Sequence, residues 1–205
     1  MSHNPSILLV DAGTGNLHSV YNALQALGAR VTLTARPKDI HGGGRIVLPG
    51  VGAFGKFMEG LREKGLEPAL LEAIERGDPL LGICVGMQAL FTASQEMGEH
   101  TGLRVFPGSV PRFADRPGLK VPHTGWNQLW PQKDSPLFNQ LAPGDYAYFN
   151  HSYYCAAGPD ETTATTDYSG PFASMIQRDN LFGVQFHPEK SQRVGLQILR
   201  NFIEQ

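Results

Sequence analysis

The sequence predicts an α/β fold of three layers, in which a mostly parallel central sheet is flanked by helices on both faces. In the first half of the chain, short apolar runs alternate with stretches of helical periodicity, which is typical of parallel strands joined by helices. With 205 residues, of which 41% are hydrophobic, the chain is also long enough to build one sizeable core. We therefore expect a single domain over residues 1–205.

The elements of the first half follow from apolar spacing and turn residues. Short apolar runs predict strands at residues 6–11, 30–34, 45–48 and 80–83. Apolar side chains at helical spacing from Leu17 onward predict a helix that Gly28 ends as a C-cap. Further helices are expected at residues 57–76, broken near Gly65 and Pro68, and at residues 85–91.

The second half is richer in short strands and turn residues. Strands are expected at residues 127–130, 146–154, 161–166, 172–177 and 181–187. A closing helix is expected at residues 191–203, and its apolar face consists of Val194, Ile198, Leu199 and Phe202. The segment 107–122 holds four Pro and two Gly, and we interpret it as a surface loop within the domain.

Composition excludes several classes of protein. The formal net charge is −2, from 17 basic and 19 acidic side chains, and no basic block marks a nucleic-acid binder. No apolar run approaches the roughly 18 residues of a membrane span, and residues 1–5 lack the features of a signal peptide. Two cysteines cannot form a disulfide framework, and no zinc-type spacing occurs. We expect a cytoplasmic enzyme or enzyme subunit with no nucleic acid or membrane partner.

The strongest local signal is Gly82-Ile83-Cys84-Val85-Gly86, between an expected strand and an expected helix. The pattern matches a nucleophile elbow with Cys in place of Ser, in which the nucleophile occupies a strained turn and glycines let the backbones pass closely. The N-terminus of the following helix would favour the thiolate form of Cys84. Taken alone, the motif also fits a buried structural Cys between two packing glycines.

A thiolate that attacks a carbonyl needs a base and a group that orients this base. His187 and Glu189 follow the last expected strand, and residues two apart in an extended chain face the same side. Pro188 fixes φ between them, so Glu189 could hold the imidazole and stabilise its protonated form. By itself, the pair is equally compatible with a strand-end His that caps a turn beside a solvated Glu.

The oxyanion hole is expected to combine two backbone N–H groups, those of Val85 and of Val51. Val51 lies in the glycine-containing loop at residues 49–54, which follows the strand at 45–48. The same loop satisfies the dinucleotide pattern G-x-G-x-x-G, but it lacks the short helix and second strand of that motif. The earlier Gly13-x-Gly15-x-x-His18 fails the pattern at its last position, so we expect a plain or ligand-lining turn there.

Two further clusters, HTGWN at residues 123–127 and NHSYY at residues 150–154, each place a His beside aromatic residues. His123 and His151 could each be a ligand, a rival base or a satisfied core histidine. A zinc site built from them with His187 and Cys84 has no spacing signature, so neither a metal nor a cofactor is expected. Cys155 is expected to be a packed thiol.

GICVGMQ at residues 82–88 and FHPEKS at residues 186–191 together resemble the triad-type class I glutamine amidotransferases. In that family a Cys, a His and a Glu hydrolyse glutamine through a thioester and release ammonia to a synthase site. PGVGAF at 49–54, HTGWN at 123–127 and HSYY at 151–154 narrow the resemblance, over nearly the whole chain, to the family of glutaminase subunits of imidazole glycerol phosphate synthase. Asn150 departs from the pattern, which has an aliphatic residue before His151.

The resemblance implies a flavodoxin-like, class I glutamine amidotransferase-like fold and specific residue roles. Cys84 would be the nucleophile, His187 the general base and acid, and Glu189 the group that orients it. The residues that would hold the amino-acid end of L-glutamine are Gly50, Gly52, Gln88, Ser152 and Tyr153. The residues implied at or near the face that docks a cyclase barrel are Asn16, Trp126, Tyr148 and Lys190.

The chain shows no Walker motif or phosphate barrel for the second half of such a reaction. We therefore expect a partner that receives the ammonia. The resemblance implies that this partner is a cyclase subunit in a heterodimer, which makes imidazole glycerol phosphate and AICAR from PRFAR in histidine biosynthesis. A charged fraction of 18%, against a typical value of about 25%, fits a covered face. The alternatives are a glutaminase of another amidotransferase, such as that of pyridoxal phosphate synthesis, a stand-alone cysteine hydrolase, or a non-enzymatic binding protein.

Overall fold

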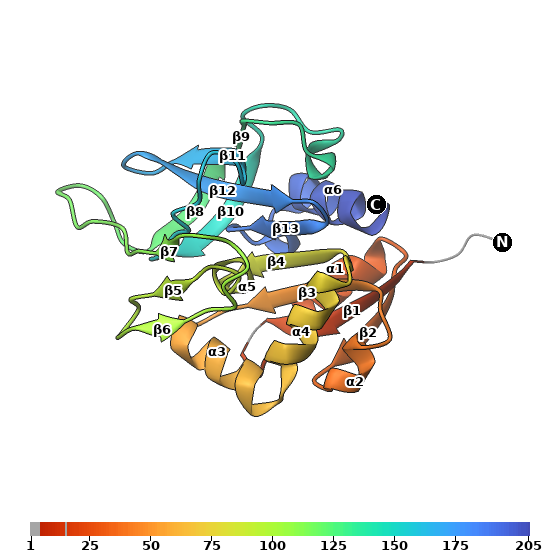
Figure 1. Ribbon diagram of the computed structural model, residues 1–205. Coiled ribbons are helices and arrows are strands. Elements are labelled where there is room, and N and C mark those ends of the chain that lie inside the picture. The colour runs from red at the N-terminus through yellow and green to blue at the C-terminus, as the bar shows by residue number, and fades with distance from the viewer. Residues whose placement is uncertain (1–4, 15) are drawn as a thin grey trace.

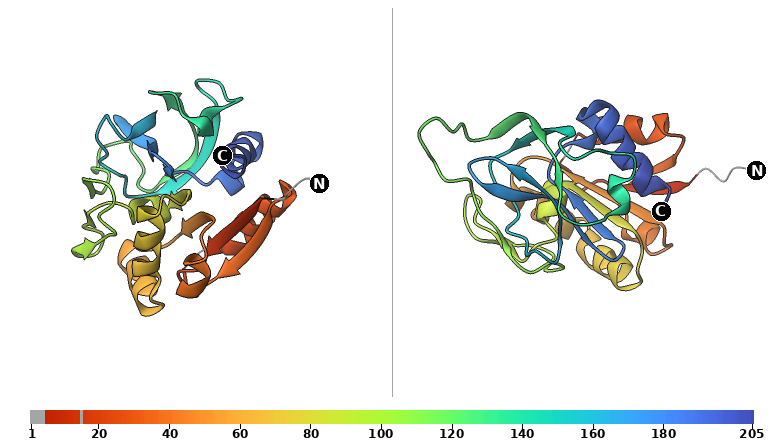
Figure 2. Two further views of the ribbon diagram at one scale, coloured as in Figure 1. Left: turned by 45° about the vertical axis from the view of Figure 1, so that its right-hand side comes forward. Right: turned by 90° about the horizontal axis from the view of Figure 1, so that it is seen from above.

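The computed structural model describes residues 5–14 and 16–205, and it has a central sheet between two layers of helices (Figures 1 and 2). Gly15 of the first glycine turn and residues 1–4 lie outside the described residues. The strands of the main sheet are β1 (Ser6–Val10), β2 (Arg30–Thr34), β3 (Arg45–Gly50), β4 (Leu80–Cys84), β9 (Trp130–Pro131), β11 (Thr162–Asp167), β12 (Pro171–Arg178) and β13 (Leu181–Val184).

The order of these strands across the sheet is β2-β1-β3-β4-β13-β12-β11-β9. The strands from β2 to β13 run parallel to their neighbours, whereas the pairs β13–β12, β12–β11 and β11–β9 are antiparallel. The predicted α/β class with a mostly parallel sheet is therefore confirmed. The consequence for function is that β3, β4 and β13, which are adjacent, end at the same edge of the sheet.

Helices cover both faces of the sheet. On one face lie α1 (Leu17–Ala26) and α6 (Gln192–Ile203), which contact each other. The other face carries α2 (Pro37–Ile40), α3 (Phe54–Glu63), α4 (Leu66–Glu75) and the single turn α5 (Val85–Gln88) (Figure 1). Further short elements are β5 (Ala93–Ser94), β6 (His100–Thr101), β7 (Ser109–Val110), the antiparallel pair β8 (His123–Gln128) and β10 (Tyr146–His151), and the 3₁₀ turns η1 (Pro136–Phe138) and η2 (Pro188–Lys190).

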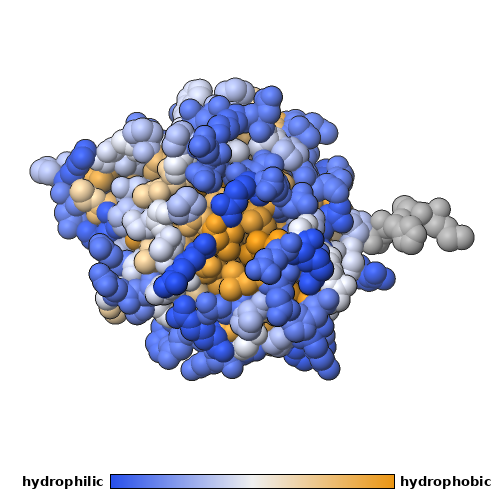
Figure 3. Space-filling view, in the orientation of Figure 1, coloured by the Kyte–Doolittle hydropathy of each residue, from blue (hydrophilic) through white to orange (hydrophobic). Residues whose placement is uncertain are grey.

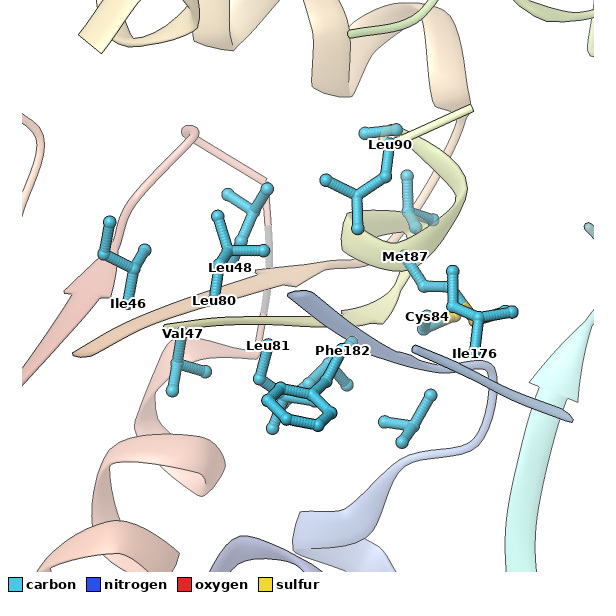
Figure 4. Packing of buried hydrophobic residues seen from close by; sticks show 14 of the residues in the cluster. Ile46, Val47, Leu48, Leu80, Leu81, Cys84, Met87, Leu90, Ile176 and Phe182 are labelled. Carbon is cyan, nitrogen blue, oxygen red and sulfur yellow. The ribbon is translucent and has the colours of Figure 1, made fainter. Parts of the chain in front are cut away.

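The core lies on both faces of the parallel strands. β4 is buried over its whole length, and only the first residue of β3 is not, which is why both strands appear in the sequence as continuous apolar runs. Figure 4 shows Val47, Leu81 and Phe182 on one side of these strands and Leu48 and Leu90 on the other. On the α6 side, the ring of Phe182 meets that of Phe202 edge to face at 6.0 Å.

Most expected elements are present, and the differences have local causes. The break between α3 and α4 falls at Gly65, which has φ of 65°, whereas Pro68 lies inside the first turn of α4, where a missing N–H costs no hydrogen bond. The helix expected at residues 85–91 ends at Gln88, and the strand expected at 181–187 ends at Val184. The strand expected at 127–130 is wrong, since β8 already ends at Gln128 and β9 is a separate strand.

Apolar side chains gather near the middle of one face of the molecule. Figure 3 shows this hydrophobic area framed by hydrophilic side chains. Elsewhere, the exposed aromatic side chains Trp126, Trp130 and Tyr146 belong to β8, β9 and β10 respectively. None of the described helices combines the length and the hydropathy needed to cross a membrane.

We expect two leucines of α6 to differ strongly in their effect on stability. Leu199 is fully buried, so Leu199→Ala should lower the free energy of unfolding by about 2–5 kcal/mol. Leu196 on the same helix is 37% exposed, and Leu196→Ala should cost less than about 1 kcal/mol. Urea denaturation followed by circular dichroism measures both values. Equal losses would contradict the packing of α6 against the sheet.

Candidate active site

Cys84 stands at the sharp turn between β4 and α5. Its backbone has φ of 54° and ψ of −110°, a conformation that residues with a side chain rarely adopt. A Cβ at Gly86 would lie 1.8 Å from the carbonyl oxygen of Leu48. A Cβ at Gly82 would lie 2.7 Å from the carbonyl oxygen of Gly86. The glycines are therefore required because the turn presses α5 against β3 and β4, as the elbow pattern predicts.

The helix after Cys84 is shorter than the sequence suggests. Cys84 is the N-cap residue of α5, but α5 is a single turn, so its dipole is small. Cys84 is only 3% exposed. Polar neighbours must therefore provide most of the stabilisation that a thiolate needs here.

His187 and Glu189 are in direct contact. Glu189 Oε1 accepts a hydrogen bond from Nδ1 of His187 at 2.9 Å, and the two side chains are 4% and 1% exposed. The reason expected from the sequence is wrong, because the chain is extended at His187 but not from Pro188 onward. Pro188 instead starts the turn η2, and this turn brings the carboxylate back to the ring.

The environment of His187 favours its protonated form. Burial alone lowers the pKa of His187, but hydrogen bonds and charges of Cys84 and Glu189 raise it more, to about 10 from 6.5. An imidazolium at neutral pH is the partner that a thiolate needs, and it can give its proton to a leaving amine. The structure therefore brings Cys84, His187 and Glu189 into one contact network.

The loop after β3 passes next to the elbow. Gly50 pairs in register with Cys84, and the next residue, Val51, lines a cavity of about 430 Å³ together with Val85. Gly50 does not line this cavity, although we expected it to hold substrate. A Cβ at Gly50 would lie 2.7 Å from the ring of Phe57 and 2.8 Å from the nitrogen of Gly86, so this glycine permits close packing.

The cavity brings together residues from distant parts of the sequence. The predicted substrate residues among those that line it are Gly52, Gln88, Ser152 and Tyr153. Cys84 and His187 line it as well. Its volume lies in the range of small-molecule sites, about 300–1,000 Å³. A thiol, an imidazole and backbone amides around such a space can perform acyl transfer on a small amide or ester.

Two residues of the site were not expected from the sequence. Glu96 lines the cavity, and its Oε2 accepts a hydrogen bond from the N–H of Phe54 at 2.6 Å, at the start of α3. Gln185 is fully buried, and its Nε2 lies 3.7 Å from Sγ of Cys84. No sequence motif indicates Glu96, whereas Gln185 precedes His187 by two residues and could have been found by the spacing argument used for Glu189.

Three of the residues expected at a docking face form one cluster. The rings of Trp126 and Tyr148 meet edge to face at 6.0 Å, and Nζ of Lys190 lies 5.9 Å from the centre of the Tyr148 ring. Trp126 is 45% exposed. Lys190 also lines the cavity, as does the fourth expected residue, Asn16. The cluster therefore lies at the mouth of the site.

His123 and His151 are core histidines that bond each other. Nδ1 of His123 lies 3.1 Å from Nε2 of His151, and Nδ1 of His151 lies 2.7 Å from the carbonyl oxygen of Tyr153. Burial lowers the pKa of His123 to about 4 and that of His151 to about 3, so both rings are neutral. Among the described residues, no group of three or more His, Cys, Asp and Glu could hold a metal ion.

Two smaller expectations also have outcomes in the structure. Asn150 is exposed and accepts a hydrogen bond from Oγ1 of Thr124 at 3.1 Å across the β8–β10 pair, so a polar residue fits this position. Cys155 is 1% exposed, and burial, together with the charge of Cys84, raises its pKa. Cys155 is therefore a packed thiol.

Comparison with known proteins identifies the family. Residues 8–205 match the family model of glutamine amidotransferase class-I. The imidazole glycerol phosphate synthase subunit HisH of Gloeobacter violaceus is 47% identical over 207 residues, which cover 100% of this chain and 91% of the relative. The HisH subunit of Moorella thermoacetica is 50% identical and covers 97% and 94% of the two chains. The chain belongs to the HisH family of class I glutamine amidotransferases. The resemblance indicated by the motifs is thus confirmed, as is the prediction of an enzyme of this class.

Solved structures agree with this fold. A crystal structure of a glutamine amidotransferase superposes with a TM-score of 0.75 at 20% identity, over 96% of this chain and 97% of the other. The structure of PurLQS from Thermotoga maritima gives a TM-score of 0.74 at 18% identity, over 98% of each chain. At these identities the likeness concerns the fold alone, and it confirms the amidotransferase-like architecture expected for a HisH family member.

The raised pKa of His187 predicts how stability depends on pH. The folded protein holds this proton up to about pH 10 and the unfolded chain only up to about 6.5, so the stabilisation is complete below pH 6.5 and is lost as pH rises toward 10. Glu189→Gln removes a charge that raises the pKa, and it should flatten this decline. Urea denaturation between pH 6 and 10 measures the effect, with Glu204→Gln, an exposed position, as the control. Identical pH profiles for Glu189→Gln and the parent would refute the assignment.

Proposed function

We propose that this chain hydrolyses L-glutamine to glutamate and ammonia at Cys84 and passes the ammonia to the cyclase subunit of an imidazole glycerol phosphate synthase. The cyclase would use it to make imidazole glycerol phosphate and AICAR from PRFAR in histidine biosynthesis. The observation that carries the proposal is the contact network of Cys84, His187 and Glu189 on one cavity in a member of the HisH family. Residues 1–205 would act as one glutaminase domain.

The proposed reaction runs through a thioester. The thiolate of Cys84 attacks the side-chain amide carbon of glutamine and forms a C–S bond, and the N–H groups of Val51 and Val85 stabilise the oxyanion. The imidazolium of His187 then protonates the leaving nitrogen, and the C–N bond breaks to release ammonia. The neutral imidazole next removes a proton from water, whose oxygen attacks the thioester and frees glutamate and the thiolate. Glu189 keeps Nδ1 of His187 protonated throughout.

The amino-acid end of glutamine needs partners of both charges. Glu96 is a carboxylate on the cavity wall, and it suits the α-ammonium group of the substrate. Gly52, Ser152 and Tyr153 line the same space and suit the α-carboxylate with their N–H and O–H groups. Gln88 supports this wall, since its Nε2 donates to the carbonyl oxygen of Tyr153 at 3.1 Å.

The proposed cyclase partner docks at the mouth of the cavity as a barrel subunit of a heterodimer. Trp126, Tyr148 and Lys190 support this, because an aromatic pair with one exposed ring and a cation beside it is typical of interface hot spots. Asn16 and Lys190 line the cavity itself, so a partner bound there would cover its entrance and receive the ammonia.

A cytoplasmic location is proposed from the two free thiols, which stay reduced in that compartment.

Glutamate release by the purified chain, alone and with a cyclase subunit plus PRFAR, tests the proposed activity. We expect weak turnover alone and a sharp rise in the mixture.

Cys84→Ala should abolish turnover both alone and in the mixture, while Cys155→Ala, which changes the other buried thiol, should retain it. His187→Ala should lower kcat by about 10²–10⁴-fold, and Glu189→Gln should lower it less. Strong turnover by the chain alone would favour the stand-alone hydrolase, and none in the mixture would favour another amidotransferase.

Two tryptophans of equal exposure provide a matched test of the docking face. Trp126 and Trp130 are both 45% exposed, but only Trp126 belongs to the cluster at the cavity mouth. Trp126→Ala should weaken binding of the cyclase by about 30-fold or more, as expected for a hot-spot residue, whereas Trp130→Ala should leave it unchanged. Isothermal titration calorimetry measures both dissociation constants. A loss for Trp130→Ala alone would move the proposed interface away from the cavity.

A further inference from the structure

A buried amide lies beside the catalytic sulfur and has no part in the triad. Gln185 directly follows β13, and the register pair Val184–Ile83 places it next to Cys84 on the neighbouring parallel strand. Its side chain is fully buried, and its Nε2 lies 3.7 Å from Sγ of Cys84, within reach of an N–H···S hydrogen bond. A buried polar side chain aimed at a reactive atom requires an explanation.

The neighbours of Gln185 determine which end of its amide faces the sulfur. The carbonyl oxygen of Tyr153 can only accept, so Gln88 must present its nitrogen to it, at 3.1 Å. The same nitrogen lies 3.2 Å from Oε1 of Gln185 and donates its second hydrogen there. The oxygen of Gln185 is therefore occupied by Gln88, and its NH₂ group points to Cys84.

The acceptor that orients Gln88 is itself held by the histidine pair. His151 donates from Nδ1 to the carbonyl oxygen of Tyr153 at 2.7 Å, which leaves its Nε2 free to accept from Nδ1 of His123 at 3.1 Å. Nε2 of His123 then accepts from Nδ2 of Asn127 at 3.3 Å. Because both rings are neutral, each donor meets an acceptor. One hydrogen-bonded chain thus runs from β8 to the catalytic sulfur.

We propose that Gln185 is a catalytic residue, whose side-chain N–H donates a hydrogen bond to the thiolate of Cys84 and thereby favours the charged form of the nucleophile. The inference rests on the proposed function, because it takes Cys84 to be the nucleophile. The positioning residues are Gln88, His151 and His123, which act on the sulfur only through the orientation of the Gln185 amide.

The chemistry of the thioester route gives such a donor two uses. Before the attack, it stabilises the thiolate as a charge-assisted hydrogen bond in a buried site. When water attacks the thioester, the C–S bond breaks and the electron pair returns to the sulfur, so the donor stabilises the leaving group. His187 becomes an imidazolium when it takes the proton from this water, and its charge also stabilises the departing thiolate. The amide of Gln185 keeps its donor at every step, so it supports the sulfur in addition to the triad.

Two variants of Gln185 distinguish the effect of its N–H on the sulfur of Cys84 from the effect of its carbonyl oxygen on Gln88. Gln185→Met keeps a similar volume and removes both hydrogen bonds, while Gln185→Glu keeps an acceptor for Gln88 but removes the donor. The measurement is the rate of Cys84 alkylation by iodoacetamide between pH 5 and 10, on the full chain, with mass spectrometry to locate the label. Asn201→Leu is the control, since Asn201 is a buried amide that donates to the carbonyl oxygens of Leu137 and Asn139 at 2.9 and 2.7 Å.

We expect the midpoint of the rate–pH profile to move up by about one pH unit in both Gln185 variants, because a hydrogen bond to a charged group is lost. Glutaminase kcat should fall by about tenfold or more with the cyclase and PRFAR present. Asn201→Leu should lower Tm and leave the alkylation profile unchanged. Profiles of both Gln185 variants that match the parent would overturn the inference, as would a shift in Gln185→Met alone, which would assign the effect to Gln88.

The alkylation assay requires no glutamine turnover, so it separates this inference from the proposed function. If Cys84→Ala retains glutaminase activity, the proposed function fails whatever the alkylation profiles are. If Cys84→Ala is inactive while the Gln185 variants alkylate and turn over like the parent, only the inference about Gln185 fails.

Discussion

The close approach of the backbone at Gly86 is the constraint on which the site depends. Where β4 turns into α5, a Cβ at Gly86 would lie 1.8 Å from the carbonyl oxygen of Leu48, so only glycine lets α5 pack against β3. This packing places Cys84 at the end of β4 in a strained conformation, and it places the loop after β3 beside the sulfur. The strain is held by β3 and β13 on either side of β4, whose residues are buried except the first of β3, so these strands cannot move apart without exposing the core.

Environment, and not residue type, divides the histidines of the site into two roles. His187 has Cys84 and Glu189 within hydrogen-bond reach, and these partners raise the pKa of His187 in spite of its burial. His123 and His151 are buried as well, but they face each other, aromatic rings and a carbonyl oxygen, so burial keeps them neutral. The first ring can transfer a proton, while the other two hold a loop in place.

Sequence spacing indicated Cys84, His187 and Glu189 as neighbours, for reasons that the structure supports only in part. The glycines around Cys84 match the elbow pattern in the sequence, and the structure gives their steric cause, since a Cβ at Gly86 would lie 1.8 Å from the carbonyl oxygen of Leu48. The pairing of His187 with Glu189 was correct, but the turn η2 produces it and not an extended strand. Glu96 was missed because it reaches the cavity from the turn between β5 and β6, through a contact with Phe54 that lies 42 residues away in the sequence.

The sequence by itself determined the α/β class, the elbow pattern at Cys84, the strand and helix on either side of it and the candidate base and acid. These features depend on local periodicity and on short residue patterns, which a stretch of ten or so residues already contains. Only the tertiary structure decided which polar groups meet around the sulfur, that Gly50 serves packing, and that Gln185, Gln88 and the histidine pair form one chain. The physical reason is that the chain is joined by hydrogen bonds between Gln88 and Tyr153, Gln88 and Gln185, and His123 and His151, whose partners lie 28 to 97 residues apart, and no local pattern specifies such contacts.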